Sequence, residues 1–211
     1  MRTLRTSNLS SRTRIRIIKT LVFTAALLPL AYFTYLATSG GLGANPIEFT
    51  TRYLGDWALR ALILVLAASP LRQISGWIWP IRVRRMLGLF AFFYITAHLL
   101  SYVALDHFFD WREIGADIVK RTYITVGMTA FAITAALAVT STKGWIRRLG
   151  AKRWQTLHRL VYGAAILGVV HFFMMVKADL SLPMVHGAAL AALLAWRIAY
   201  HWRAGIRVGT S

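Results

Sequence analysis

The sequence predicts an all-α integral membrane protein, a bundle of six transmembrane helices with both termini in the cytoplasm. Hydrophobic residues make up 57% of the 211 residues and charged residues only 15%, against roughly 25% charged residues in soluble domains. The charges also cluster and leave long uncharged stretches between them. Because a spanning helix needs about 20 apolar residues, these stretches predict six spans, at residues 17–37, 57–75, 86–105, 122–141, 156–177 and 183–202.

The distribution of charge predicts the orientation of these spans. If the N-terminus is cytoplasmic, all but six of the 25 lysines and arginines fall on the cytoplasmic side, the exceptions being Arg52, Arg60, Arg112, Lys120, Arg121 and Lys177. All seven acidic residues fall on the other side: Glu48, Asp56, Asp106, Asp110, Glu113, Asp117 and Asp179. This is the positive-inside pattern of membrane proteins. Because this distribution accounts for the net charge of +18, the sequence indicates a multi-pass membrane protein embedded in the lipid bilayer, and no nucleic-acid partner.

The sequence predicts one transmembrane domain at residues 17–202. A basic cytoplasmic tail at residues 1–16 precedes it, and a second cytoplasmic tail at residues 203–211 follows it. The outer segment Asp106–Arg121 is expected to form a short helix on the membrane surface. The absence of cysteine excludes disulfides, thioether-attached haem, cysteine-ligated clusters and CxxC redox chemistry. A chain of this composition needs a bound cofactor to move electrons.

Three histidines, His98, His158 and His171, lie inside predicted spans. An ionisable side chain at bilayer depth is costly and therefore marks function, and neutral imidazole is the usual protein ligand of b-type haem. His98 lies 13 residues after Arg85 and His171 lies 13 residues after His158, a rise of about 20 Å in each helix. The two histidines therefore share a depth in the outer half of the membrane. We expect them to clamp one haem iron as axial ligands.

His158 lies near the cytoplasmic face, where no histidine of another span can pair with it. Arg84, 14 residues before His98, shares the helix face of that histidine. Two interpretations stay open for this inner position. His158 holds a second haem, with Arg84 or water opposite, or Arg84 pairs with a haem propionate or a flavin phosphate.

The two histidines of the fifth span do not share a helix face. His158 and His171 are separated by about 220° beyond full turns of an ideal helix, so a distortion is expected, for which Gly163 and Gly168 are candidates. The remaining three histidines are expected at the membrane interfaces: His107, His186 and His201.

Two other functions compete with haem-based electron transfer. A small transporter or proton channel would use the buried histidines as a relay, but the repeat symmetry and matched broken spans of transporters are not found in the sequence. A self-contained ferric reductase would need a nicotinamide-binding domain, and no GxGxxG segment follows a strand. The sequence also lacks a cluster of catalytic carboxylates or nucleophiles. We therefore favour an electron-transfer subunit with no complete catalytic site of its own.

Several segments resemble the MsrQ (YedZ) family, the haem-binding membrane subunits of bacterial methionine sulfoxide reductase systems, whose wider relatives are ferric-reductase-like membrane domains. The resemblance covers about residues 17–180. Its motifs are GGLGANP at Gly40–Pro46, RVRRMLGL at Arg82–Leu89, HLLSY at His98–Tyr102, KRTYITVG at Lys120–Gly127, LAVTST at Leu137–Thr142 and LGAKRWQTLHRLVY at Leu149–Tyr162.

The resemblance implies a division of labour. Relatives pair histidines of their third and fifth helices, and this sequence departs from a two-pair pattern at Arg84. The implied cofactors are haem b, one copy or two, and FMN. The implied electron donor is a cytoplasmic flavin reductase or the quinone pool. The implied acceptor is a periplasmic molybdopterin-containing subunit, MsrP, which reduces methionine sulfoxide in oxidised periplasmic proteins.

Overall fold

The computed structural model describes residues 3–208, with side chains for residues 11–203, and this part of the chain contains helices and no strands. In chain order the elements are α1 (Thr3–Thr38), α2 (Pro46–Ser75), α3 (Trp79–Ser101), the π-helix η1 (Tyr102–Asp106), α4 (Trp111–Lys120), α5 (Thr122–Val139), α6 (Lys143–Leu149), α7 (Ala151–His158), α8 (Leu160–Met175) and α9 (Ser181–Val208). Six segments of the described chain are long and apolar enough to cross a membrane: Ser11–Thr38, Pro46–Ser75, Trp79–Asp106, Thr122–Val139, Ala151–Met175 and Ser181–Arg203. The predicted all-α, six-span class is confirmed.

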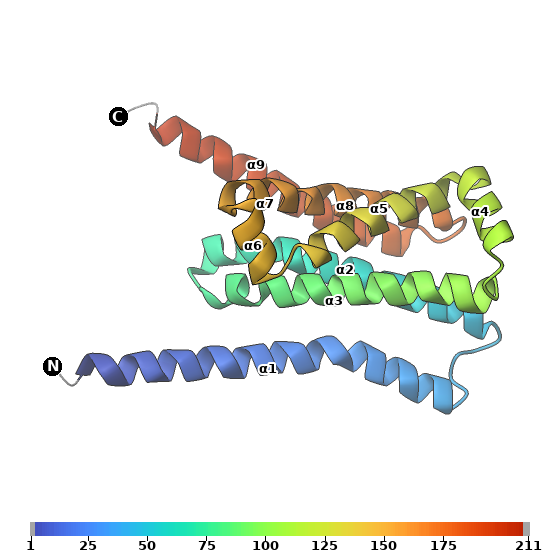
Figure 1. The fold of residues 1–211 in the computed structure, drawn as a ribbon, viewed down its shortest axis with the longest axis horizontal. Coiled ribbons are helices and arrows are strands. Elements are labelled where there is room, and N and C mark those ends of the chain that lie inside the picture. Colours follow the sequence, from blue (N-terminus) through green and yellow to red (C-terminus); the bar gives the residue numbers. More distant parts are fainter. Residues whose placement is uncertain (1–2, 209–211) are drawn as a thin grey trace.

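The long helices run roughly parallel, with both chain ends at the same end of the bundle and α4 at the opposite end (Figure 1). We call these the basic end and the acidic end. The acidic end holds α4, the α1–α2 connection and the α8–α9 connection, and all seven acidic residues lie in or near these segments. The predicted short surface helix between the third and fourth spans is present as α4.

Helix α2 begins eleven residues before the start predicted for the second span. Asn45 caps it, because its side chain accepts a hydrogen bond from the backbone N–H of Glu48, and Pro46 occupies the first turn. In the first turns Arg52 Nη2 lies 2.7 Å from Glu48 Oε1, and further along Arg60 Nη2 lies 2.6 Å from Asp56 Oδ2. Ion pairs four residues apart stabilise a charged stretch as helix, which a hydropathy pattern does not reveal.

The fifth span is interrupted at Arg159, between α7 and α8. The backbone N–H of Arg159 donates to the carbonyl of Thr156 at 3.1 Å, a three-residue bond that tightens the turn. The break therefore follows His158 directly. The prediction that Gly163 and Gly168 carry the distortion is wrong, because both lie within the regular helix α8.

Helix α1 lies apart from the other spans (Figure 1). Two tyrosines tie it to the bundle. Tyr94 Oη donates to the carbonyl of Ala26 at 2.7 Å, and Tyr53 Oη donates to the carbonyl of Pro29 at 2.8 Å. At its start, α1 runs through much of the predicted cytoplasmic tail, whose residues 1–2 lie outside the described chain, as do residues 209–211 of the second tail.

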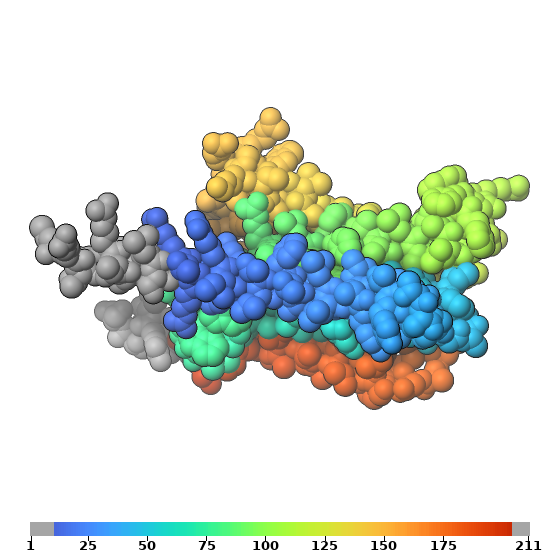
Figure 2. Space-filling view, turned by 90° about the horizontal axis from the view of Figure 1, so that it is seen from below, coloured from blue at the N-terminus to red at the C-terminus, as the bar shows by residue number. Residues whose placement is uncertain are grey.

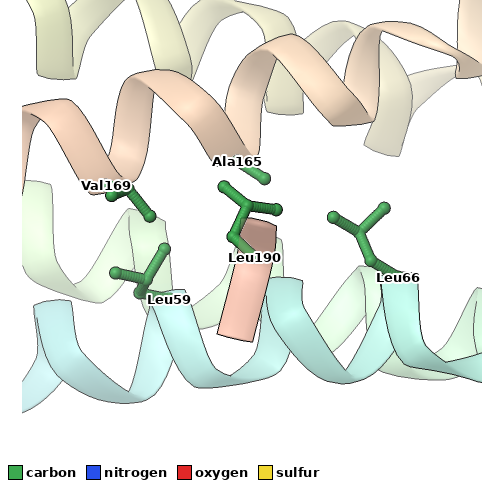
Figure 3. Packing of buried hydrophobic residues seen from close by; sticks show 5 residues of the cluster. All are labelled: Leu59, Leu66, Ala165, Val169 and Leu190. Carbon is green, nitrogen blue, oxygen red and sulfur yellow. The ribbon is translucent and has the colours of Figure 1, made fainter. Parts of the chain in front are cut away.

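The core forms where α2 meets α3, α8 and α9. One buried cluster joins α2, α8 and α9 and contains Leu59, Leu66, Ala165, Val169 and Leu190 (Figure 3). A second joins α2 to α3 and contains Leu54, Ala58, Phe90 and Tyr94. Helix α2 packs most closely with α3, and α5 packs most closely with α8. These two helix pairs position His98 and His171.

Candidate functional site

His98 lies on α3 with its imidazole against the backbone of α2. Its Nδ1 lies 2.8 Å from the carbonyl oxygen of Thr51, and because a carbonyl only accepts, Nδ1 carries the proton. One turn on, a Cβ added to Gly55 would lie 3.0 Å from that same Nδ1. The ring therefore packs directly on the glycine backbone. Nε2 remains as the nitrogen with a free lone pair for a metal.

His171 on α8 repeats this arrangement against α5. Its Nδ1 lies 2.8 Å from the carbonyl oxygen of Tyr123, and a Cβ added to Gly127 would lie 3.0 Å from Nδ1 and from Cε1. In both helix pairs the carbonyl comes four residues before the glycine. The same device thus fixes the tautomer and the ring position of both histidines. A hydrogen bond to Nδ1 is the usual outer-shell partner of a metal-bound histidine.

The structure brings the two imidazoles together near the acidic end, on α3 and α8. The ring centroids of His98 and His171 lie 6.1 Å apart, with planes inclined at 77°. Metal–nitrogen bonds are about 2.0–2.1 Å long, so this spacing leaves room for one metal atom between the two rings. The spacing and the two free Nε2 atoms fit a site in which both histidines would hold one haem iron.

A cavity of about 420 Å³ opens nearer the basic end. It brings together His158 and Arg84, the two residues that the sequence assigned to an inner site. Arg85, Arg159 and Arg197 also line it, and no acidic residue does.

Two arginines of this cavity have only neutral partners in the described chain. Arg84 Nη1 donates to Ser69 Oγ at 3.3 Å. Arg197 donates to the carbonyl of Leu66 at 2.8 Å and to the hydroxyl of Tyr162, while its Nε is buried without a partner. Both side chains are half-buried, and a cation that is partly removed from water without a counter-ion is costly. The cavity therefore suits a ligand that brings negative charge.

His158 lies at the wall of the same cavity. Its Nε2 is 3.2 Å from Thr140 Oγ1, and its ring stacks on Trp154 with centroids 3.9 Å apart. Trp154 Nε1 donates in turn to the carbonyl of Thr140. The imidazole is thus held in place at the inner level without a second histidine opposite it.

Comparison with known proteins identifies the family. Residues 54–169 match the family described as ferric reductase like transmembrane component. The chain is 60% identical to a protein of Rhodospirillum rubrum named protein-methionine-sulfoxide reductase heme-binding subunit MsrQ, over 84% of this chain and 85% of that protein. Proteins of the same name from Herminiimonas arsenicoxydans and Caulobacter vibrioides are 49% and 47% identical, over 90% and 84% of this chain and 88% and 85% of their own lengths. The chain belongs to the MsrQ family.

This member of the MsrQ family also contains a polar contact between α2 and α9 that the sequence did not reveal. His186, which was expected at the outer membrane interface, is only 5% exposed and is therefore packed inside the protein. Its Nε2 lies 3.2 Å from Asp56 Oδ1 and its Nδ1 lies 2.8 Å from the carbonyl oxygen of Leu182. Asp56 also pairs with Arg60. The four-residue spacing of Asp56 and Arg60 could have predicted their ion pair, but nothing in the sequence indicated that His186 on α9 lies beside them.

His107, which was also expected at an interface, is likewise buried inside the protein, whereas His201 is exposed. The side chain of His107 is only 7% exposed and lies under the loop before α4, with Nδ1 3.4 Å from Glu113 Oε2 and Nε2 3.5 Å from Asp117 Oδ2. Its ring packs on Tyr102, with centroids 4.5 Å apart. In the MsrQ fold described here, this histidine therefore lies between η1 and α4 at the acidic end.

Proposed function

We propose that the chain is the membrane electron carrier of a methionine sulfoxide reductase system and that it holds one haem b between His98 and His171. The observation that carries the proposal is the pairing of two imidazoles from different helices, 6.1 Å apart, each tied through Nδ1 to a backbone carbonyl. The names of the MsrQ relatives, which describe haem-binding subunits, support it.

Each residue of this site has a distinct task. His98 and His171 supply the axial nitrogens, and the carbonyls of Thr51 and Tyr123 hold the imidazoles in the tautomer that leaves Nε2 free. A haem bound there supplies reversible one-electron chemistry. No group of three or more histidine, cysteine, aspartate or glutamate side chains in the described chain is arranged to hold a separate metal ion. The reduction of methionine sulfoxide then belongs to a periplasmic molybdopterin subunit, MsrP.

The direction of electron flow follows from the distribution of charge. We assign the basic end to the cytoplasm and the acidic end to the periplasm of a bacterial inner membrane, in line with the positive-inside rule. His98 and His171 lie in the half of α3 and α8 nearer the acidic end. The haem would therefore lie on the side of MsrP, while a cytoplasmic flavin reductase or quinone would donate electrons at the basic end.

The cavity at the basic end suits an anionic cofactor on this entry side. Its arginines and its lack of acids favour a haem with two propionates or FMN with its phosphate. A second haem would use His158 as its protein nitrogen, with Arg84 opposite or paired to a propionate. FMN would place its phosphate on the arginines.

Electron delivery is tested with the purified protein reduced under anaerobic conditions and mixed with MsrP and methionine sulfoxide. We expect the reduced haem bands to decay only when both are present. A His98→Ala variant, which lacks the axial nitrogen, should contain no reducible low-spin haem and should not support turnover. Reduced haem that stays reduced in the presence of the reductase and its substrate would contradict the proposal.

The occupant of the inner cavity is tested by measuring haem and FMN per chain. His158→Gln should remove one haem equivalent and leave FMN unchanged if the cavity holds a second haem. Arg84→Gln and Arg197→Gln should lower FMN and leave haem unchanged if it holds the flavin. Variants that retain both cofactors at wild-type ratios would exclude an anionic cofactor from the cavity.

A further inference from the structure

The loop between η1 and α4 is strained. Phe108 has a φ of 46° and Phe109 a φ of 63°, and they are the only non-glycine residues of the described chain with positive φ. Bulky side chains rarely adopt this left-handed conformation, and glycine or asparagine would adopt it more easily. Local strain of this kind persists where the surrounding structure enforces it and is concentrated at functional sites. Two adjacent aromatic residues in this conformation point to a use for their side chains.

Both aromatic side chains are presented outward. Phe108 is 77% exposed and Phe109 54% exposed, and Trp111 at the start of α4 is 68% exposed. The rings of Phe109 and Trp111 lie 6.2 Å apart. We call these three residues the aromatic patch. The region around α4 projects at the end of the molecule in the space-filling view (Figure 2).

The patch stands on a fixed base. The buried imidazole of His107 lies directly before it in the chain and is packed on Tyr102. The backbone N–H of Phe109 donates to the carbonyl of Val103 at 2.9 Å, and the N–H of Asp110 donates to the carbonyl of His107 at 2.8 Å. A partner that binds a preformed surface does not have to order it, which favours binding.

The aromatic patch also lies on the route out of the proposed haem site. Helix α3 carries His98 and continues without a break into η1. Phe108 comes ten residues after that histidine, a rise of about 15 Å along a helix. Tyr102, four residues after His98, contacts the ring of His107 directly before Phe108 in the chain. A redox protein on the patch would thus be near the part of the chain that holds the haem.

We infer that the aromatic patch docks a soluble redox protein with a basic rim, and that the partner's redox centre gains there the one electron that the haem iron loses. The inference rests on the proposed function and adds the place of contact. Aromatic side chains supply most of the binding energy in many interfaces, inside a polar rim. The patch is the only cluster of exposed aromatics in the described chain that lies on this route.

The charges around the patch favour a basic protein over a lipid surface. Residues 106–113 carry three acids and one arginine: Asp106, Asp110, Arg112 and Glu113. The side chains of Asp106 and Glu113 are 58% and 60% exposed. Anionic headgroups would be repelled by these carboxylates, and interfacial belts consist mainly of tryptophan and tyrosine rather than phenylalanine. A basic rim on a protein would be complementary.

The test compares two electron acceptors in stopped-flow reoxidation of the reduced full-length protein. Phe108→Asn/Phe109→Asn removes the rings with a residue that tolerates positive φ. Reoxidation by MsrP in the presence of methionine sulfoxide should fall about tenfold or more, while reoxidation by ferricyanide stays at the wild-type rate. The matched control is Tyr35→Asn, which removes an aromatic side chain that is 63% exposed on α1 and lies outside the patch. It should change neither rate.

The other outcomes overturn the inference. An unchanged rate with MsrP means that the patch is not the docking surface. A loss of haem, of membrane insertion or of the ferricyanide rate in the double variant means that the patch serves the fold or the lipid interface. If MsrP fails to reoxidise even the wild-type protein, the proposed function itself fails, and the inference with it.

Discussion

Gly55 and Gly127 allow His98 and His171 to lie directly on neighbouring helices. A Cβ at either glycine would lie 3.0 Å from atoms of the imidazole ring, closer than carbon and nitrogen pack without a shift. Each ring is also held by a backbone carbonyl one turn before its glycine. Moving the ring to make room would therefore lengthen that hydrogen bond as well.

Gly55→Ala and Gly127→Ala should each weaken haem binding. Overpacking of this kind costs about 1–3 kcal/mol, or about 5-fold to 150-fold in affinity, measurable as haem per chain after purification. Gly163→Ala on α8 is the matched control, because its added Cβ would meet nothing within 4 Å, and it should keep full haem content. Wild-type haem content in both test variants would refute the role of the glycines.

The sequence predicted that His98 and His171 form a pair, but it did not predict which groups hold their rings. A fixed rise per residue gave His98 and His171 a common depth, and the structure brings their rings together. Thr51 and Tyr123 act through backbone carbonyls, which every residue type carries. Which carbonyl meets which imidazole depends on how the helices pair, and a single sequence does not encode that in a readable pattern.

Helices α2 and α9 are joined by the contact between Asp56 and His186. The same carboxylate also pairs with Arg60. It lies one residue after Gly55, and its contact with His186 brings α9 against α2 near the histidine pair. Because its Oδ1 is buried without a hydrogen-bond partner in the described chain, the ion pair with Arg60 is the interaction that a neutral side chain would lose.

Asp56→Asn should therefore destabilise the bundle, by about 1 kcal/mol, because Arg60 loses its carboxylate partner. Thermal unfolding in detergent, followed by helical circular dichroism, should show a midpoint several degrees lower. His201→Gln at the other end of α9 is exposed and should leave the midpoint unchanged. Equal unfolding midpoints for Asp56→Asn and the wild type would mean that the carboxylate of Asp56 does not stabilise the bundle.

Hydropathy predicted the number and order of the spans but not all of their ends. Helix α2 begins at Pro46, where Asn45 caps it and Glu48 pairs with Arg52. These polar and charged residues lower the local hydropathy, so a hydropathy profile starts the span later. The break at Arg159 separates α7 from α8 through a local turn rather than through a glycine or proline. Features made by backbone geometry and by pairing lie outside what an apolar pattern can indicate.

The molecule as a whole is polarised, with most of its basic residues at one end and its acids at the other. The same polarity sets the histidine pair near the acidic end and the arginine-lined cavity near the basic end. If the basic end is cytoplasmic, electrons enter by the cavity and leave beside α4. Orientation in the membrane therefore decides the direction of the whole pathway.

Reporter fusions test this orientation. Alkaline phosphatase fused after Ser39, Asp110 or Ser181 should be active, since the positive-inside rule places these three connections in the periplasm, and fusions after Ser75 and Ser141 should be inactive. An inactive fusion at Asp110 combined with an active one at Ser141 would reverse the orientation and the proposed direction of transfer.

The central claim is that His98 and His171 bind the same haem iron, and low-temperature electron paramagnetic resonance of the oxidised protein tests it most directly. Two axial imidazoles give low-spin iron, and planes inclined at 77° predict a strongly anisotropic low-spin signal. His98→Gln and His171→Gln should each abolish that signal or convert it to high-spin. A low-spin signal that survives unchanged in either variant would contradict the claim.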